Sequence, residues 1–354
     1  MRHLGRFASW RSPLVAIVFA ATLGACGGGK GSAPSVIKLQ GAGASFPAPL
    51  YSRWFKTYNA QHPEVQVDYQ SVGSGSGVKS VIDKTVDFGA SDAAMTEEEM
   101  ARVPNGVQLL PMTAGSIVLT YNVEGVTNLK LSRKAYAGIF LGTIKTWNDP
   151  AIAATNEGVK LPSSPINVVV RADSSGTTYV FTKHLSAISP EFEKSPGVNK
   201  MPAWPVGTRS KGNEGVTAAV KTTPGAIGYI EFGYAKSQNL PMAALENKSG
   251  KYVVADTASG QAALGDAPLP DDMIVWNSDP QSEAAYPIVT YTWLILYKQY
   301  QDPRKLEALR NIVKYGLGEG QSIAEQLGYI PLPVAIAQKV TSTVDNVKVA
   351  SAAN

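Results

Sequence analysis

Cysteine and histidine are scarce in this sequence of 354 residues. The single cysteine, Cys26, has no partner for an internal disulfide, and the three histidines, His3, His62 and His184, show no metal-ligand spacing. No Gly-x-Ser-x-Gly motif occurs. These scarcities disfavour zinc sites and serine hydrolases, and we expect a protein without cofactor, metal or catalytic residues.

Excess positive charge is also nearly absent once the N-terminus is set aside. The formal charge of +4 falls to +1 without Arg2, Arg6 and Arg11 (4 − 3), because residues 1–25 contain no acid. Such a balance gives no indication of nucleic-acid binding. The basic start and the apolar run Leu14–Leu23, which is too short to span a bilayer comfortably, predict a signal peptide over residues 1–25.

The signal peptide ends in Leu23-Gly24-Ala25-Cys26, which resembles the bacterial lipobox. In that family the peptidase cleaves before the cysteine, which then carries the lipid, so we expect Cys26 to be the lipidation site. A plain signal peptide with an incidental cysteine is the alternative. Residues 26–35, rich in glycine and serine, predict a flexible tether to a body in the periplasm or at the cell surface.

The mature chain repeats one local arrangement, a short apolar strand followed by a turn of small residues and a helix. Three such turns are predicted, at Ala44–Phe46, Gly73–Gly77 and Ser174–Thr177. The first unpaired N–H groups of a helix attract anions, and ligands of open α/β sheets gather at the carboxyl ends of strands. Together the turns indicate an anion site built from several segments.

Two charged side chains lie at predicted strand ends and would join this site. Arg171 follows the strand Val168–Val170 and offers a bidentate fork for a tetrahedral oxyanion, with Asp173 placed to hold the guanidinium. The alternative is an ordinary capped helix beside a surface Arg–Asp pair. Asp92 follows the strand Val86–Ala90 and would favour a ligand that donates a proton, unless it only caps a nearby helix.

The glycine-rich loops do not match nucleotide-binding motifs. In the stretch Gly73–Ser80, Val78 stands where the phosphate-binding loop of nucleotide enzymes requires glycine before Lys-Ser. The stretch Gly41–Phe46 lacks the third glycine of a dinucleotide fingerprint. Both loops suit anion binding without the groups needed for turnover.

Two long apolar segments, Val107–Asn122 and Tyr286–Tyr297, predict crossings between two domains, which the chain length also favours. We therefore expect an α/β fold of two lobes joined by a two-crossing hinge. Lobe 1 is predicted to be discontinuous, with residues 36–113 and 287–349, and lobe 2 to comprise residues 114–286.

Several segments, in order along the whole mature chain, resemble the periplasmic phosphate-binding protein family of the Pst ABC transporter. The matching segments are residues 41–51, 69–79, 86–93, 140–150, 171–178 and 225–231. The resemblance implies two α/β domains that close over phosphate, a monomer, and delivery of inorganic phosphate to the Pst permease subunits and their ATPase complex. A hydrolase or transferase acting on phosphate esters, or the same fold binding sulfate or molybdate, remains an alternative.

The resemblance also implies the ligands. The residues it assigns to phosphate are Ser45, Phe46, Ser74, Asp92, Arg171, Ser175, Gly176 and Thr177, with Asp173 as the partner of Arg171. Ser45 stands where the family often has threonine, which keeps the hydroxyl. The residues after Ser74 depart from the family order. Trp147, Asn148 and Tyr229 are interpreted as core or turn residues of lobe 2.

Overall fold

The computed structural model describes residues 36–265 and 269–350. The predicted signal peptide, the predicted lipidation site Cys26 and the predicted tether lie outside the described residues. Within the described part of the chain, no helix is both long and apolar enough to cross a membrane.

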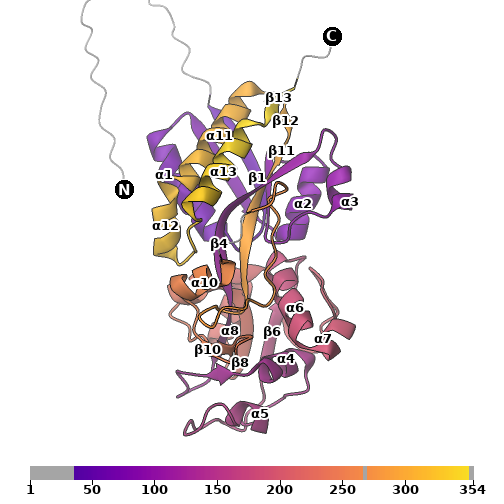
Figure 1. The fold of residues 1–354 in the computed structure, drawn as a ribbon, viewed down its shortest axis with the longest axis vertical. Helices are drawn as coiled ribbons and strands as arrows, with labels where there is room; N and C mark the ends of the chain where they lie inside the picture. The colour runs from indigo at the N-terminus through magenta and orange to yellow at the C-terminus, as the bar shows by residue number, and fades with distance from the viewer. Residues whose placement is uncertain (1–35, 266–268, 351–354) are drawn as a thin grey trace, which may run out of the picture. The chain divides into compact units, whose positions relative to one another are not determined.

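Eight strands follow one another in a single hydrogen-bonded order. The order is β2 (Val65–Ser71), β1 (Ile37–Gly43), β3 (Phe88–Ser91), β11 (Val289–Tyr297), β4 (Val107–Asn122), β8 (Ala226–Glu231), β6 (Asn167–Arg171) and β7 (Thr208–Ser210). β2, β1 and β3 run parallel, as do β8, β6 and β7, whereas β11 and β4 are antiparallel to their neighbours. Two parallel groups are thus joined by a central antiparallel pair (Figure 1).

Strand β4 connects the two groups because it changes partner along its length. Its residues up to Ser116 pair with β11, and from Ile117 onward they pair with β8. β4 is buried from Leu109 to Tyr121, and β11 is buried from Val289 to Leu296. Strands covered on both faces have near-continuous apolar sequences, which is why both segments could be predicted as crossings. The exact lobe boundaries stay a prediction.

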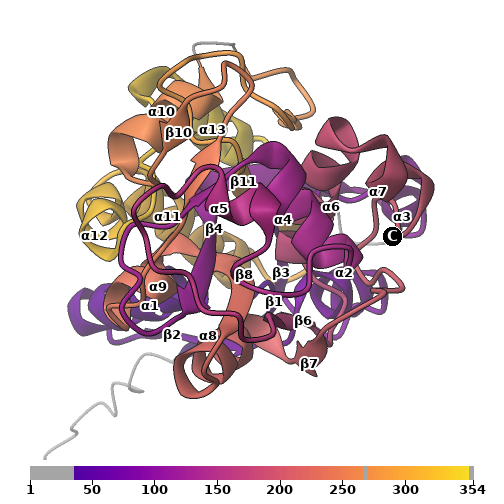
Figure 2. The ribbon, with the colours of Figure 1, turned by 90° about the horizontal axis from the view of Figure 1, so that it is seen from below.

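Helices cover each parallel group, as expected for an α/β fold. Around β1–β3 lie α1 (Ala48–Gln61), α2 (Ser74–Ile82), α3 (Glu97–Ala101), α11 (Pro303–Leu317), α12 (Gly320–Leu327) and α13 (Val334–Asp345). Around β6–β8 lie α4 (Arg133–Leu141), α5 (Pro150–Ala153), α6 (Gly176–Ile188), α7 (Pro190–Lys194), α8 (Gly212–Thr222) and α9 (Phe232–Ser237). Helix α8 lies on one side of β8 and β6, and α4 and α6 lie on the other (Figure 2).

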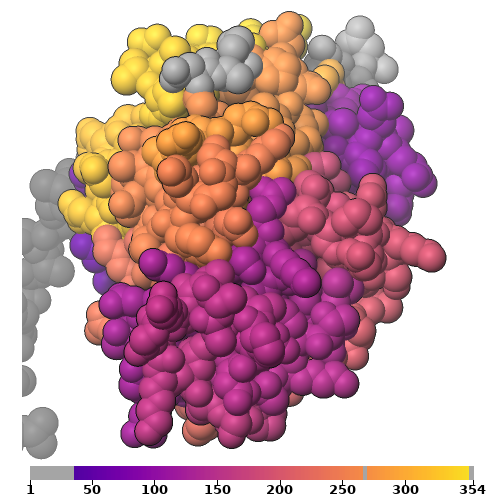
Figure 3. Space-filling view, turned by 60° about the horizontal axis from the view of Figure 1, so that its bottom comes forward, coloured from indigo at the N-terminus to yellow at the C-terminus, as the bar shows by residue number. Residues whose placement is uncertain are grey.

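The remaining elements are short. They are α10 (Thr257–Leu264), a small sheet of β10 (Tyr252–Val253), β9 (Ala244–Glu246) and β5 (Lys130–Leu131), and the pair β12 (Gln299–Tyr300) and β13 (Lys348–Val349). On the face shown in Figure 3, the magenta segment that contains α4 and α5 lies beside the orange segment that contains α10.

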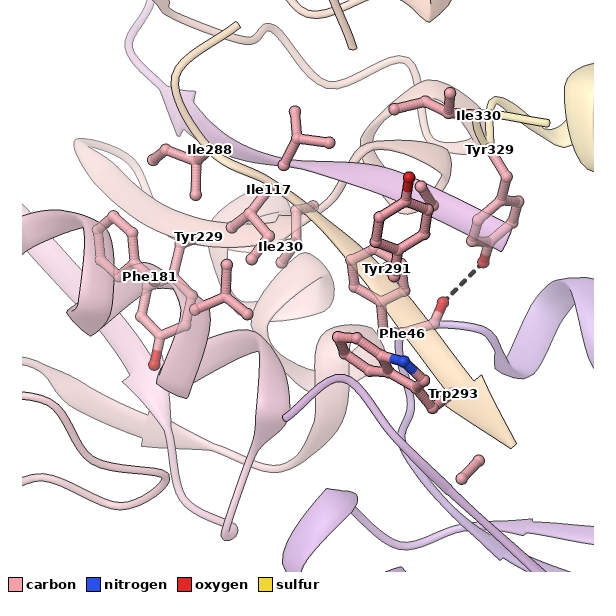
Figure 4. Packing of buried hydrophobic residues seen from close by; sticks show 14 of the residues in the cluster. Phe46, Ile117, Phe181, Tyr229, Ile230, Ile288, Tyr291, Trp293, Tyr329 and Ile330 are labelled. Carbon is pink, nitrogen blue, oxygen red and sulfur yellow. Dashed lines mark hydrogen bonds between the residues drawn. The ribbon is translucent and has the colours of Figure 1, made fainter. Parts of the chain in front are cut away.

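Aromatic side chains pack on both sides of the central pair (Figure 4). Phe181 stacks on Tyr229 with ring centroids 4.5 Å apart, and Trp147 is fully buried, as interpreted from the sequence. On the other side the Tyr329 hydroxyl donates to the Phe46 carbonyl at 2.7 Å. This bond fixes the backbone of the first small-residue turn to the segment between α12 and α13.

Candidate functional site

The three small-residue turns lie at the carboxyl ends of parallel strands, as predicted, and lead into α1, α2 and α6. Two of these helices begin earlier than the sequence analysis expected, α2 at Ser74 and α6 at Gly176. The Ser175 hydroxyl oxygen accepts from the Thr178 N–H at 3.0 Å, which makes Ser175 the N-cap of α6. Ser74 and Gly176 are therefore first-turn residues, whose N–H groups have no partner inside the helix.

The turns of the two parallel groups touch each other directly. The Gly75 N–H donates to the Ser174 carbonyl at 2.9 Å. A Cβ added to Gly176 would lie 2.5 Å from the Ser74 hydroxyl oxygen and 2.8 Å from the Asp92 nitrogen. Only glycine allows this approach, so α6 brings its N-terminus against Ser74 and Asp92.

Arg171 is the buried cation of this region, with a relative exposure of 2%. Its Nε and Nη2 atoms donate to the Asp173 carboxylate at 2.9 and 2.6 Å, so the predicted ion pair is present. Asp173 also accepts from the Gly212 N–H at 3.0 Å. Burial raises the pKa of Asp173, but the bonds and charge of Arg171 outweigh it and hold that pKa below its usual value.

One edge of the guanidinium remains unpaired. Arg171 Nη1 is buried and has no hydrogen-bond partner among the described residues. A buried donor without a partner is costly, particularly on a charged group. Asp173 therefore fixes the orientation of Arg171 and leaves the N–H groups of Nη1 without a partner among the described residues.

Asp92 is a buried carboxyl, 1% exposed, beside this cation. Its oxygens accept from the Thr292 hydroxyl at 2.8 Å and, at a longer 3.4 Å, from the Thr177 hydroxyl. Its N–H donates to the Ser74 hydroxyl oxygen at 3.3 Å. The nearby helix α3 is capped by Thr96, so Asp92 is not its cap.

The charge of Asp92 is disfavoured by its surroundings. Burial raises its pKa to about 7, although the Thr292 hydrogen bond and the charge of Arg171 oppose that shift. A second buried carboxyl, Glu231, has its pKa raised to about 8, mainly by burial and in part by Asp92. Near neutral pH the region therefore combines one permanent positive charge with carboxyls that readily hold protons.

Ser45 and Phe46 form the first turn and are both buried. The Ser45 hydroxyl oxygen accepts from the Asn213 backbone N–H at 3.0 Å and from its Nδ2 at 2.9 Å. The Ser45 carbonyl accepts from the Tyr234 hydroxyl at 2.6 Å. Contacts from the other parallel group thus fix this turn, as the Tyr329 contact fixes Phe46.

Ser175 and Thr177 complete the predicted set, and both have 0% exposure. The Ser175 N–H donates to the Lys200 carbonyl at 2.9 Å, so its backbone donor is already used. The hydrogen of its hydroxyl remains available. Thr177 lies between Asp92 and the Asn213 Nδ2 atom, which is 3.3 Å from its hydroxyl oxygen.

The sequence analysis assigned no site role to several polar residues that contact the predicted set, among them Asn213, Thr292 and Tyr229. Asn213 follows Gly212 at the start of α8, and this Gly-Asn helix start resembles the three turns that were recognised. Thr292 is a polar residue inside an apolar strand, a signal that could have been noticed. Tyr229 is buried as interpreted, but its hydroxyl also lies 2.7 Å from that of Thr178 and accepts from the Arg171 N–H at 3.2 Å.

Comparison with known proteins supplies the family. A model described as the PBP superfamily domain matches residues 28–314. The phosphate-binding protein PstS of Pasteurella multocida is 39% identical over 306 residues, covering 85% of this chain and 88% of that protein. This chain belongs to the PstS phosphate-binding proteins. The PstS of Methanocaldococcus jannaschii is 36% identical over 367 residues, covering 95% and 94% of the two chains.

Solved structures support the fold of this PstS family member. A phosphate-binding protein from Stenotrophomonas maltophilia has a TM-score of 0.72 at 21% identity, covering 87% of this chain and 94% of that one. A periplasmic phosphate-binding protein solved with bound phosphate has a TM-score of 0.70 at 21% identity, covering 90% and 100%. The predicted two-lobed periplasmic-binding fold is confirmed.

Proposed function

We propose that this protein binds inorganic phosphate outside the inner membrane and delivers it to an ABC permease for import. The observation that carries the proposal is the unpaired, buried Nη1 of Arg171, whose opposite edge is held by Asp173. Neighbouring hydroxyls and helix N-termini add donors around the same point. Such a set suits a tetrahedral oxyanion, and the PstS relatives are named for phosphate.

Asp92 favours phosphate over sulfate or molybdate. A buried carboxyl beside an anion is unfavourable unless the two share a proton. Phosphate near neutral pH bears at least one O–H, whereas sulfate bears none. The raised pKa of Asp92 makes this preference depend on pH, because a protonated carboxyl carries no charge and can itself donate to sulfate; the preference is strongest above a pH of about 7.

We assign the phosphate contacts to the eight residues predicted from the sequence. They are Ser45, Phe46, Ser74, Asp92, Arg171, Ser175, Gly176 and Thr177, with Asp173 holding Arg171 in place. Their convergence supports the assignment, since four segments contribute and the polar side chains among them are buried.

The proposed lobes are residues 36–113 with 287–349, and residues 114–286, and they close over the ligand. Direct bonds between the two groups support closure. The Lys200 ammonium lies 3.0 Å from Glu99, close to the Gly75–Ser174 contact. A ligand held by both lobes favours the closed arrangement through its higher affinity for that state.

Binding without catalysis is the role we propose, in a monomer anchored at the periplasmic or cell surface through a lipid on Cys26. Residues 1–25 would be the signal peptide and 26–35 the tether. The buried His184 supports a non-catalytic role, because its ring nitrogens face the Tyr136 hydroxyl at 2.8 Å and the Ser278 carbonyl at 2.7 Å. It thus has structural partners rather than a nucleophile.

Calorimetric titration of ligand-stripped protein with phosphate and with sulfate tests the proposal. We expect tight, saturable phosphate binding and little heat with sulfate. Comparable binding of both anions would refute the phosphate assignment. In parallel, turnover of a chromogenic phosphate monoester above the buffer rate would refute binding without catalysis.

A further inference from the structure

Asn213 makes an unusually complete set of hydrogen bonds for a residue with no predicted role. It has 0% exposure and opens helix α8. Its backbone N–H and its Nδ2 both donate to the Ser45 hydroxyl oxygen, at 3.0 and 2.9 Å. Nδ2 also donates to the Thr177 hydroxyl oxygen at 3.3 Å, and Oδ1 accepts from the Glu231 N–H at 2.9 Å.

The orientation of this amide is fixed by a partner that can only donate. The Glu231 backbone N–H requires an acceptor, so the oxygen of the Asn213 side chain must face it. The two hydrogens on Nδ2 then face Ser45 and Thr177. A flipped amide would place Nδ2 against the Glu231 N–H, two donors facing each other, and lose that contact.

Counting lone pairs shows what this does to Ser45. A hydroxyl has one hydrogen and two acceptor sites. Both acceptor sites of Ser45 are occupied by Asn213. Its hydrogen is then the part of the hydroxyl left to interact, so Ser45 can offer a ligand a donor and not an acceptor. Thr177 likewise accepts from Asn213 and directs its hydrogen toward Asp92.

We propose that Asn213 is a positioning residue that sets the Ser45 hydroxyl as a hydrogen donor for the bound oxyanion and turns the Thr177 hydroxyl toward Asp92. The proposal rests on the phosphate-binding function proposed above. An oxyanion is lined with acceptors, so a hydroxyl that presented a lone pair to it would repel it. Asn213 prevents this orientation of the hydroxyl before the ligand arrives. A donor that is already oriented loses less conformational freedom when the ligand binds.

The side chain most like asparagine provides the sharpest test. Asn213→Asp keeps the shape of the side chain, and one carboxylate oxygen can still accept from the Glu231 backbone N–H. The other oxygen replaces Nδ2, so an acceptor now faces Ser45 and Thr177 in place of a donor. The Ser45 hydrogen would turn toward the new carboxylate and away from the ligand, and the Thr177 hydrogen would turn away from Asp92. Loss of the charge-assisted bond from Ser45 should weaken phosphate binding about tenfold or more at neutral pH.

A pH series separates this effect from a structural defect. Protonation of the introduced carboxyl restores a donor on that side, so the affinity deficit relative to wild type should shrink toward acidic pH. The charged and titratable groups around Asn213 and its partners are Asp92, Arg171, Asp173, Glu214, Glu231 and Tyr234. They are present in both proteins, so the ratio of the two affinities at each pH isolates the introduced group.

A matched control exists in Asn156, another buried asparagine whose Oδ1 accepts from a backbone N–H, that of Lys130 at 2.9 Å. Its Nδ2 donates to the Lys130 and Ile152 carbonyls at 2.7 and 2.8 Å. Asn156→Asp places a carboxylate against carbonyl oxygens and should destabilise the fold. We expect its phosphate affinity to stay within about twofold of wild type, because additivity holds for distant sites.

Titration calorimetry with inorganic phosphate measures all variants. If wild type fails to bind phosphate, the proposed function itself is wrong. If wild type binds and Asn213→Asp binds equally well, only the role of Asn213 is refuted. Should Asn213→Asp not fold, the phosphate affinities of Asn213→Ala, Ser45→Ala and their double variant provide the test. If Asn213 acts through Ser45, the losses of binding free energy in the two single variants are not additive in the double variant. Purely additive losses would refute this role.

Discussion

Replacing Asp92 by asparagine should change which anions this protein accepts. The substitution keeps the shape of the side chain and its place between Thr292 and Thr177, whose hydroxyls donate at 2.8 and 3.4 Å. The rotatable hydroxyls can also adapt to an amide. We expect phosphate to bind Asp92→Asn only modestly more weakly, while discrimination against sulfate collapses.

The size of the effect follows from the burial of Asp92. Two like charges about 4 Å apart repel by roughly 4 kcal/mol at an effective dielectric of 20. At 1.4 kcal/mol per decade, removal of the charge should raise sulfate affinity by up to roughly a thousandfold. Phosphate avoids this repulsion in the wild type because it can donate a hydrogen bond to the carboxylate.

The sign of the pH dependence follows from the pKa of Asp92, which burial raises to about 7. Below that value the carboxyl is protonated, carries no charge and can itself donate to sulfate. Wild type should therefore exclude sulfate more strongly as pH rises through about 7. In Asp92→Asn this increase should be absent, because the amide does not titrate.

Competition of labelled phosphate by excess sulfate, at about pH 5.5 and about pH 8.5, measures both effects. Asp87→Asn is the matched control: Asp87 precedes strand β3 as Asp92 follows it, and it pairs with Lys305 at 2.7 Å. That variant should discriminate like wild type. If Asp92→Asn excludes sulfate as strongly as wild type at both pH values, Asp92 does not distinguish phosphate, which bears a proton, from sulfate, and its proposed role is refuted.

Three further outcomes are expected. Arg171→Lys should weaken phosphate binding about tenfold or more, because an ammonium group cannot keep the pair with Asp173 and also offer a bidentate fork to phosphate. As a control, Arg133→Lys breaks a bidentate pair with Asp279 and should leave the phosphate affinity unchanged. Small-angle scattering should show a smaller radius with phosphate, and an unchanged radius with binding confirmed would count against lobe closure. Cys26→Ser should release the protein from membranes or leave it unprocessed, and wild-type fractionation would contradict the lipid anchor.

Much of the fold could be predicted from local patterns in the sequence. The apolar segment Val107–Asn122, predicted as a crossing, is strand β4 with the same bounds, and most of the second predicted crossing, Tyr286–Tyr297, forms strand β11 from Val289 onward. Helices α2 and α6 begin within the predicted turns Gly73–Gly77 and Ser174–Thr177, because glycine, serine and threonine there were treated as turn residues. At a helix N-terminus these residues are favoured by capping and by close approach, so low helix propensity does not mark the boundary there.

The charged members of the candidate site could be proposed because they stand at strand ends beside small-residue turns. The environment that determines their chemistry could not be proposed in the same way. Asp92 receives its shorter hydrogen bond from Thr292, 200 residues away, and Ser45 is bound by Asn213, 168 residues away. No local pattern encodes contacts of this separation.

The direction in which a hydroxyl donates is the least predictable property, and it follows from the least local contacts. A serine in a turn is ambiguous, because its oxygen can donate or accept. That ambiguity ends only when both acceptor sites are filled, which for Ser45 requires the start of α8 to meet the end of β1. Asn213 is in turn oriented by Glu231, the last residue of β8. The donors of the candidate site thus depend on contacts between the two parallel groups of strands. Any variant that weakens these contacts should lower anion affinity, even when every proposed ligand residue is intact.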